Sequence, residues 1–331
     1  MAALVAPAGA AHARLLGLGV YRPSRVVPNS EIVEAIDSSD EWIRTRSGIV
    51  ERRWATPEET VQVMSVAAAR DALADAGVDA RQIDCVIVAT VSHLSQTPAI
   101  ATLIAHELGT EQAAAFDLSA ACAGFCHGVS MASDFIRGGS ARHVLVIGVE
   151  RLSDITDRTD RGTAFIFADG AGAVVVGPSD EPGIGPVVWG SDGERADLIM
   201  QRELWPEALE TGRMPHLTMQ GNPVFRWASF AMAKIGLEAL DRAGLTVDEL
   251  DCFVPHQANM RIVDALARSM KLPERVRIAR DIAEMGNTSA ASIPLALERM
   301  KREGEAKSGD TALFIAFGAG LAYAAQVVIV P

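Results

Sequence analysis

The chain has 331 residues, of which 49% are hydrophobic and 22% are charged, and this composition is typical of a folded globular protein rather than a disordered one. Its formal net charge of −12 argues against a general nucleic-acid-binding function, because phosphate groups bind to basic surfaces. The length predicts two domains or two fused halves.

The first residues, 1–13, are rich in alanine. They lack the basic residues that begin a secretory signal peptide, and Pro7 and Gly9 interrupt the apolar stretch. No part of the chain approaches the run of about 18 apolar residues that a membrane-spanning helix needs. We therefore expect residues 1–13 to be an extension before the first strand of a cytoplasmic protein that has no membrane partner.

The chain has four cysteines, which form no C-x-x-C pair and are too few for a disulfide framework, so a reduced thiol protein is expected. One of them, Cys122, lies between a short buried strand pattern at 113–118 and a helix pattern that ends at Gly138-Gly139. Free N–H groups and the positive dipole end at the start of that helix would lower the pKa of Cys122 and favour a reactive thiolate. The alternative is an inert, buried cysteine.

A sequence repeat links the two halves of the chain. A helix pattern that ends at Gly77, followed by a buried strand near Cys85, recurs 167 positions later at Gly244 and Cys252. Each copy is an αβ unit. Accidental similarity between two ordinary αβ segments is the alternative explanation.

The repeat predicts an α/β fold of two similar halves, residues 14–180 and 181–331, with the boundary in the Pro- and Gly-rich stretch 178–193. At the same spacing Cys122 falls on Ser289, in another turn of small residues. Since turns after equivalent strands meet in such a duplicated fold, turns of the second half can supply partners for Cys122.

Two candidate partners stand in these turns. His256 follows a strand-like segment at 250–254, at the strand end where α/β proteins tend to bind ligands, and histidine is the commonest acid or base near neutral pH. Asn287 follows Gly286, and its amide can donate a hydrogen bond to a developing oxyanion. The alternatives are a solvated loop histidine and a helix-capping asparagine.

Taken together, these residues make the chain resemble the β-ketoacyl-acyl-carrier-protein synthase III family, thiolase-like condensing enzymes that begin fatty-acid synthesis. The resemblance extends from about residue 14 to residue 330 and implies a layered αβαβα fold. It is densest in five motifs, which are Ser39-Asp40-Glu41-Trp42-Ile43, Ala120-Ala121-Cys122-Ala123-Gly124-Phe125, Asp160-Arg161-Gly162-Thr163, Val254-Pro255-His256-Gln257-Ala258-Asn259 and Gly286-Asn287-Thr288-Ser289-Ala290-Ala291-Ser292.

The resemblance implies a two-stage reaction. Cys122 takes the acyl group of an acyl-CoA, with the backbone N–H groups of Cys122 and Ala319 as the oxyanion hole. His256 and Asn287 then assist the decarboxylation of malonyl acyl carrier protein, and the product is a 3-oxoacyl carrier protein. Acyl-CoA is a substrate here, and no permanently bound cofactor or metal is expected.

The resemblance also implies binding residues for both substrates and a homodimer. The alternatives are surface charges for the arginines and a partly buried core position for Trp42. The positions that match coenzyme A contacts are Trp42, Arg46, Arg161, Gly221, Asn222 and Asn259, and those that match the basic face for the acyl carrier protein are Arg226, Arg261 and Arg268.

Two features leave specificity open. Thr97 stands where some relatives carry a phenylalanine that closes the acyl pocket across the dimer, so we expect branched or longer primers to be accepted. The stretch 195–217 matches the family least well. The alternatives are a relative in secondary metabolism, which performs starter condensation or acyl transfer, and a non-catalytic partner subunit, although the latter would be expected to lose Cys122.

Overall fold

Two five-stranded sheets form the framework of the protein, whose computed structural model describes residues 4–331. The first sheet has, in spatial order, the strands β1 (His12–Tyr21), β7 (Asp169–Ser179), β6 (Val144–Arg151), β4 (Cys85–Ala89) and β5 (Ala114–Leu118). The second has β12 (Arg277–Ile278), β11 (Cys252–Pro255), β13 (Thr311–Gly318), β14 (Ala322–Ile329) and β8 (Val188–Ser191).

The two sheets share a pattern of strand directions. β4 is parallel to both of its neighbours, and so is β11, whereas the other pairs are antiparallel. β4 and β11 are the two strands that the sequence repeat predicts to be equivalent. Their carboxyl ends, and those of their parallel neighbours, carry the turns that build the site.

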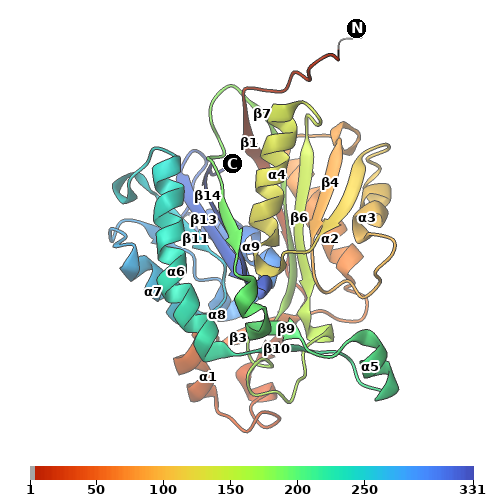
Figure 1. Cartoon of the computed structure of the whole chain (residues 1–331), viewed down its shortest axis with the longest axis vertical. Helices are drawn as coiled ribbons and strands as arrows, with labels where there is room; N and C mark the ends of the chain where they lie inside the picture. The colour runs from red at the N-terminus through yellow and green to blue at the C-terminus, as the bar shows by residue number, and fades with distance from the viewer. Residues whose placement is uncertain (1–3) are drawn as a thin grey trace.

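Helices fill three layers around the two sheets (Figure 1). α4 (Gly124–Gly138) and α9 (Ser292–Arg302) lie between the sheets and share one buried core with both of them. This is the predicted layered αβαβα fold of two duplicated halves. The outer layers are α2 (Val61–Ala76) and α3 (Ile100–Leu108) on the first sheet and α6 (Gly221–Arg242) and α7 (Met260–Ser269) on the second.

The helix predicted after Cys122 is α4. The apolar residues at helical spacing, Phe125, Val129, Ala132 and Ile136, are all at most 1% exposed, because they face the core between the sheets. Gly139 ends the helix in the left-handed conformation with φ 79°, which a glycine adopts without a steric penalty.

The equivalence between the two halves shifts by one residue near the site. Ala121 and Ser289 are the matching residues, since both have a left-handed φ, 45° and 47°, and each begins a short 3₁₀ turn, η3 (Ala121–Ala123) and η7 (Ser289–Ala291). Cys122 therefore corresponds to Ala290, and the predicted match with Ser289 is wrong. The segment between the repeated strand and this turn is one residue longer in the second half.

β5 differs from its prediction as a buried strand. It lies at the edge of the first sheet, where Ala114 is exposed and the other residues are half-buried. Only one side of an edge strand finds a hydrogen-bonding partner within the chain. The apolar pattern of 113–118 was thus read correctly as a strand, but its place in the sheet was not.

The remaining elements lie at one end of the layers, at the bottom of Figure 1. Residues 193–219 include a two-stranded ribbon of β9 and β10, together with α5, which projects from the body. These elements are β2 (Arg25–Pro28), α1 (Asp40–Ser47), β3 (Glu51–Trp54), β9 (Ile199–Gln201), α5 (Trp205–Glu210), β10 (Leu217–Met219) and α8 (Ile282–Met285).

The ends of the chain add two observations. Residues 4–11 precede β1 and contact α4 through a hydrogen bond of 3.1 Å from the Ala10 N–H to the Ile136 carbonyl. Residues 1–3 of the predicted N-terminal extension lie outside the described residues. Among the helices of residues 4–331, none is both long and apolar enough to cross a membrane.

Candidate active site

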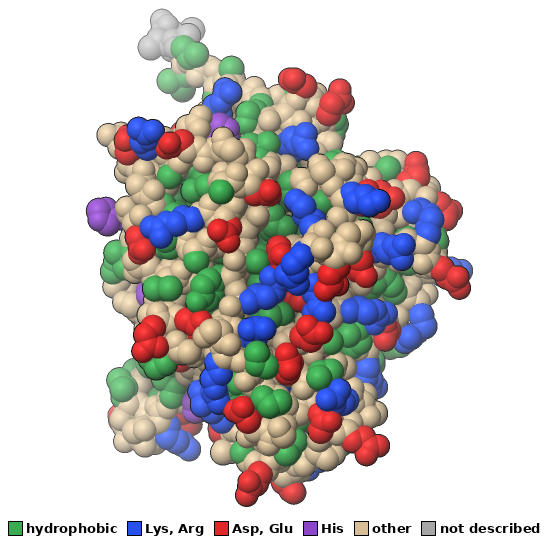
Figure 2. Space-filling view, turned by 180° about the vertical axis from the view of Figure 1, so that it is seen from behind, with side chains coloured by type: hydrophobic (Ala, Val, Ile, Leu, Met, Phe, Trp, Pro, Cys, Tyr) green, Lys and Arg blue, Asp and Glu red, His purple; other side chains and the backbone are tan. Residues whose placement is uncertain are grey.

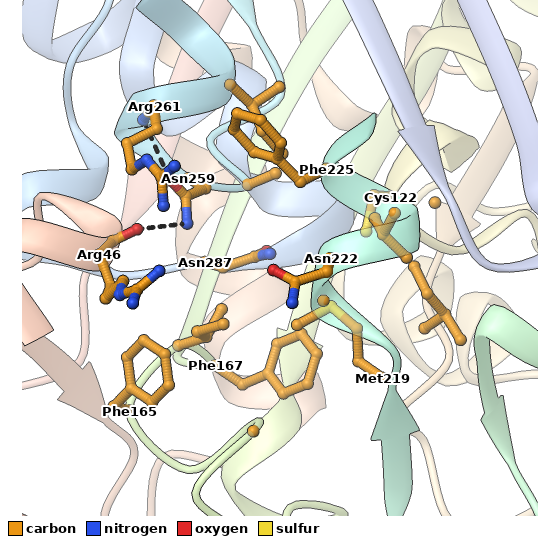
Figure 3. Close-up of a pocket in the computed structure, with 18 of the residues that line it drawn as sticks. Arg46, Cys122, Phe165, Phe167, Met219, Asn222, Phe225, Asn259, Arg261 and Asn287 are labelled. Carbon is orange, nitrogen blue, oxygen red and sulfur yellow. Dashed lines mark hydrogen bonds between the residues drawn. The ribbon is translucent and has the colours of Figure 1, made fainter. Parts of the chain in front are cut away.

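A cavity of about 420 Å³ opens at the end of the layers where the parallel strands finish (Figure 3). Cys122, His256 and Asn287, which are far apart in the sequence, all line it. The residues predicted to contact coenzyme A line the same cavity, and these are Trp42, Arg46, Arg161, Gly221, Asn222 and Asn259.

Cys122 is the middle residue of η3, which joins β5 to α4. Desolvation raises the pKa of its thiol to about 12, the charge of Glu150 adds to this rise, and an interaction with the side chain of Ser289 opposes it. The prediction that the helix start lowers this pKa is therefore wrong. Cys122 precedes α4 and is half-buried at the wall of the cavity, and desolvation of its sulfur is the largest cause of the shift.

β13 approaches Cys122 closely at its last residue. A Cβ atom on Gly318 would lie 2.8 Å from the Cys122 nitrogen and 3.0 Å from its sulfur, closer than such atoms pack. Gly318 lines the cavity, whereas Ala319, which begins the next 3₁₀ turn, is not among the lining residues of the described chain. The contact of Gly318 with Cys122 was not predicted, although the Gly318-Ala319-Gly320 run in the sequence marks a close backbone approach.

His256 directly follows β11 and is 2% exposed. Its Nδ1 lies 2.7 Å from the hydroxyl of Ser292 on α9, and that hydroxyl also accepts a hydrogen bond of 3.3 Å from the Gln257 N–H. The ring of Phe317 packs edge-on against the imidazole with 5.6 Å between ring centroids. Burial lowers the pKa of His256 to about 3, so the imidazole is neutral at physiological pH.

Asn287 is held by its oxygen. Its Oδ1 accepts a hydrogen bond of 2.9 Å from the Ser289 N–H, and the residue is 5% exposed. The side chain thus forms a turn with its own backbone, as many asparagines do. Because the oxygen is engaged in this turn, the amide nitrogen is the group that Asn287 can offer as a donor to a molecule in the cavity.

Two arginines flank the ring of Trp42 at the far end of the cavity. The guanidinium carbon of Arg161 lies 5.0 Å from the ring centroid, and that of Arg46 lies 5.9 Å from it. Phe165 packs edge-on against the same indole at 5.2 Å. Trp42 is half-buried, so the core role and the binding role that the sequence left open are compatible.

Asn259 connects two elements at the cavity (Figure 3). Its Oδ1 accepts a hydrogen bond of 2.9 Å from the Arg261 N–H, which caps the start of α7. Its amide nitrogen donates to the carbonyl of Arg46 in α1 at 3.1 Å. Asn259 therefore fixes the position of α1 relative to α7.

An apolar wall, which was not predicted from the sequence, completes the cavity. Phe165 and Phe167 come from the segment after the Asp160-Arg161-Gly162-Thr163 motif, Met219 ends β10, and Phe225 stands on α6 (Figure 3). The apolar run Phe165-Ile166-Phe167 beside that motif was the available signal.

The other predicted site residues lie outside the cavity or at its rim. Thr97 is exposed in the loop before α3 and is absent from the described cavity lining. Arg226 on α6 and Arg268 near the end of α7 are exposed. Arg261 lines the cavity, and its guanidinium carbon lies 4.9 Å from the centroid of the Phe225 ring.

No group suited to metal binding accompanies this cavity. Within residues 4–331, no three His, Cys, Asp or Glu side chains are arranged to hold a metal ion. The four cysteines are free, and Cys85, Cys126 and Cys252 are buried in the core. The chemistry available in the cavity is that of a thiol, a neutral imidazole, an amide and backbone N–H groups.

A layered αβαβα fold with a thiol at the ends of its parallel strands defines the thiolase-like class of condensing enzymes, and comparison with solved structures agrees. The priming β-ketosynthase from the R1128 polyketide biosynthetic pathway superposes with a TM-score of 0.97, with 50% identity over 100% of this chain and 99% of that one. The 3-oxoacyl-[acyl-carrier-protein] synthase III from Aquifex aeolicus gives a TM-score of 0.89, with 38% identity over 96% and 99%.

Sequence comparisons name the family. A family model for 3-oxoacyl-[acyl-carrier-protein] synthase III matches residues 116–193, and its C-terminal counterpart matches residues 240–330. β-Ketoacyl-[acyl-carrier-protein] synthase III 1 of Streptomyces coelicolor is 60% identical over 98% of both chains, and β-ketoacyl-[acyl-carrier-protein] synthase III of Streptomyces glaucescens is 61% identical over 98% of both. The chain belongs to the 3-oxoacyl-[acyl-carrier-protein] synthase III family of acyltransferase-type condensing enzymes.

Proposed function

We propose that this protein condenses an acyl-CoA primer with malonyl acyl carrier protein to give a 3-oxoacyl carrier protein, the first condensation of fatty-acid synthesis. The observation that carries the proposal is that Cys122, His256 and Asn287 line one cavity with the cationic and aromatic residues at its far end. We place the reaction in the cytoplasm, since four free cysteines suit a reducing compartment.

In the first stage Cys122 attacks the carbonyl carbon of the acyl thioester. A carbon–sulfur bond forms at Sγ, and coenzyme A leaves as a thiolate. The backbone N–H groups of Cys122 and Ala319 stabilise the oxyanion of the tetrahedral intermediate. The close packing of Gly318 against the Cys122 nitrogen supports this assignment, because it brings the backbone before Ala319 next to the nucleophile.

In the second stage malonyl carrier protein loses carbon dioxide, and the resulting enolate attacks the acyl carbonyl on Cys122. Neutral donors stabilise the enolate oxygen, namely the amide nitrogen of Asn287 and the Nε2–H of His256. Burial keeps His256 neutral, and the contact between Nδ1 and Ser292 leaves Nε2 for the cavity. An ionised carboxylate in place of Asn287 would repel the malonyl group.

The adenine of coenzyme A stacks between Trp42 and Arg161 in this proposal. A base with ordinary contacts on both faces needs about 7 Å between the two groups, whereas Arg161 lies 5.0 Å from the ring centroid. Arg161 must therefore swing away when the substrate enters. Arg46 contributes a phosphate contact, and Gly221, Asn222 and Asn259 border the pantetheine arm.

Two assemblies complete the proposal. The acyl carrier protein docks through its acidic surface on Arg226, Arg261 and Arg268, which belong to the neighbouring helices α6 and α7. Two copies of the chain form a homodimer through the open edge of β5, which brings Thr97 of one copy to the acyl pocket of the other. The exposed position of Thr97 and the unpaired side of β5 support this arrangement.

A second candidate has the same chemistry in another pathway. The priming β-ketosynthase from the R1128 polyketide biosynthetic pathway is 50% identical to this chain, so priming of polyketide synthesis is the alternative. The small side chain of Thr97 is expected to admit branched or longer acyl groups in either pathway. Competition among acyl-CoAs in which acetyl-CoA is preferred over all longer chains would contradict this expectation.

The test is intact-protein mass spectrometry after incubation with a panel of acyl-CoAs, followed by addition of malonyl carrier protein. We expect one acyl adduct, which disappears when malonyl carrier protein is added and never forms in Cys122→Ala. Cys126→Ala, which removes a buried thiol in the first turn of α4, just after Cys122, is the matched control and keeps the adduct. An adduct that survives in Cys122→Ala would refute the mechanism.

A further inference from the structure

Glu150 is a buried carboxylate behind Cys122 that the reaction above does not use. It is the penultimate residue of β6 and is 0% exposed. Its Oε2 accepts hydrogen bonds from the Ser92 hydroxyl at 2.6 Å, the Val91 N–H at 3.1 Å and the Thr90 hydroxyl at 3.3 Å. Its Oε1 accepts a hydrogen bond from the hydroxyl of Ser289 at 3.1 Å.

Ser289 connects this carboxylate to the nucleophile. Its hydroxyl donates to Glu150, so its oxygen is free to act as an acceptor, and the same side chain interacts with the Cys122 thiol and lowers its pKa. The turns η7 and η3, which carry Ser289 and Cys122, pack against each other and against β6. Ser289 therefore lies between Glu150 in the core and the reacting sulfur of Cys122, hydrogen-bonded to the first and interacting with the second.

The donors around Glu150 are neutral hydroxyls and one backbone amide. The neighbouring cation, Arg151, pairs instead with Asp154 at 3.1 Å. A buried carboxylate without a cationic partner is costly to ionise, and burial raises the pKa of Glu150 to about 7. Glu150 can thus gain or lose a proton near neutral pH, whereas the pKa of the Cys122 thiol is raised to about 12.

We infer that Glu150 stores the proton of Cys122 while the acyl group occupies the sulfur, and that the Ser289 hydroxyl carries this proton in both directions. The inference rests on the proposed function, because it needs an acyl group on Cys122. Glu150 acts through Ser289 and does not touch the substrate.

The proton balance of the two stages supports this role. In the first stage the proton of the Cys122 thiol passes to the Ser289 oxygen, while the hydroxyl proton of Ser289 passes to Glu150. The sulfur of Cys122 then bonds to the acyl carbon. The bond from that carbon to coenzyme A breaks, and coenzyme A leaves as a thiolate that solvent protonates. In the second stage the enolate carbon bonds to the acyl carbon, the carbon–sulfur bond breaks, and the proton returns from Glu150 through Ser289 to the Cys122 sulfur. The whole cycle then consumes one solvent proton and restores the enzyme.

A proton stored on Glu150 removes a negative charge that would repel the second substrate. A malonyl group enters the cavity as an anion after Cys122 has been acylated, and an ionised carboxylate nearby would repel it. With the stored proton, Glu150 is neutral at that moment. The returning proton also neutralises the Cys122 thiolate, which is a poor product in a desolvated site.

The test is difference infrared spectroscopy of the wild-type protein before and after acylation, at about pH 8, above the pKa of Glu150. We expect a carboxylic-acid band that appears on acylation and shifts in D₂O, and that is absent in Glu150→Gln. In stopped-flow acylation, the wild-type rate rises with the ionisation of Glu150, whereas Glu150→Gln is slower by about 10²-fold and has no such inflection.

Two further variants make the result decisive. Ser289→Ala keeps the carboxylate but removes the hydroxyl between it and Cys122, so it too loses the inflection, and it serves if Glu150→Gln fails to fold. Asp169→Asn is the matched control, because Asp169 is a buried carboxylate with a pKa raised to about 6 that binds Ser153 and the Ala55 N–H instead of reaching Cys122. Its band and its pH profile stay as in the wild type.

Two outcomes separate the proposals. A wild-type protein that gains no acyl adduct contradicts the proposed function itself. An acylated wild type without the carboxylic-acid band, or a Ser289→Ala or Glu150→Gln variant with the wild-type pH profile, overturns the role of Glu150 and leaves the proposed function intact.

Discussion

The oxygen and the nitrogen of the Asn287 side chain have different functions, and one substitution can distinguish them. Its oxygen holds the turn to the Ser289 N–H, while its nitrogen is the proposed enolate donor. Asn287→Asp keeps an oxygen for the turn but replaces the donor with a charge. We expect acylation of Cys122 to continue and condensation to slow by about 10²- to 10³-fold, the usual effect of losing one oxyanion donor.

The measurement is the rate of each half-reaction by quenched-flow mass spectrometry. Asn259→Asp is a suitable control, because Asn259 also accepts a backbone hydrogen bond but lies at the coenzyme A end of the cavity. That variant should weaken acyl-CoA binding and leave the condensation of an already acylated enzyme unaffected. Equal losses in both half-reactions of Asn287→Asp would contradict the donor role.

For single residues, the sequence predicted which side chains take part in the reaction better than it predicted what surrounds each of them. Cys122, His256 and Asn287 were found because their neighbours form recognisable turns, and all three line one cavity. Glu150 was missed, although it is the one acidic residue in the apolar strand run 144–150 and that pattern was visible. The pKa of Cys122 was predicted in the wrong direction, since desolvation depends on what surrounds the sulfur in three dimensions.

The end of β13 sets the position of the nucleophile among the elements. Gly318 has an extended backbone, so an alanine there would be tolerated by the backbone itself, but its Cβ would collide with Cys122. We expect Gly318→Ala to slow acylation by about 10²-fold, as a displacement of roughly 1 Å at a reacting atom does. Circular dichroism checks the fold, and mass spectrometry checks the adduct.

Gly193→Ala is the matched substitution for this experiment. A Cβ on Gly193 meets nothing within 4 Å, so any loss of activity in that variant would reflect glycine replacement in general. We expect its acylation rate to equal that of the wild type. An active Gly318→Ala variant would mean that β13 does not constrain Cys122.

The open edge of β5 is tested by charge. Leu103 on α3, which packs next to β5, is 40% exposed, and Leu237 on α6 is exposed to the same extent. If two copies pair through β5, Leu103→Glu places charges in the buried contact, and the protein shifts towards monomers. Leu237→Glu is the control and should leave the dimer intact. Sedimentation velocity measures the shift, and a wild-type monomer would refute the dimer.

Regular elements were predictable where local patterns agree with the tertiary fold. α4 has its apolar residues at helical spacing and a glycine at its end, so its limits followed from the sequence. The edge position of β5 and the one-residue shift between η3 and η7 did not follow. Strand order and turn equivalence depend on contacts between segments that are distant in the sequence.

The buried side chain of His256 makes the free energy of unfolding of the whole molecule fall at acid pH. His256 has a pKa of about 3 in the fold against an ordinary value of 6.5, so between these values the unfolded chain binds a proton that the folded chain does not. Protons therefore favour unfolding in this window, and stability falls as the pH is lowered through it. Glu150, with a raised pKa, acts in the opposite sense as the pH rises from 4.5 to about 7.

We expect His256→Asn to lose less stability than the wild type between pH 6.5 and pH 4.5, by about 2 to 3 kcal/mol. Urea unfolding at the two pH values measures the difference. His106→Asn, at an exposed position on α3, is the control and should follow the wild type. Parallel curves for His256→Asn and the wild type would contradict the prediction.

Charge on the molecular surface is more mixed than the net value of −12 suggests. On the face shown in Figure 2, basic and acidic side chains lie side by side rather than in fields of one sign. Arg299, for example, forms ion pairs with Asp281, Glu284 and Glu303. Net charge therefore excluded a general nucleic-acid binder at the level of the sequence, but it did not describe any single surface.

The ribbon of β9 and β10 has a consequence for how such an enzyme can diverge. It contributes Ile199 and Met219 to the cavity, yet it belongs to neither five-stranded sheet. The buried residue just before β9, Leu198, packs with Val224 and Leu321 in a cluster separate from the cores of the two sheets. An exchange of residues 193–219 between relatives would therefore change the walls that a primer meets while it leaves the two sheets in place. Evolution or protein engineering can therefore change the primer specificity by exchanging this one segment, while the catalytic residues and the reaction stay the same.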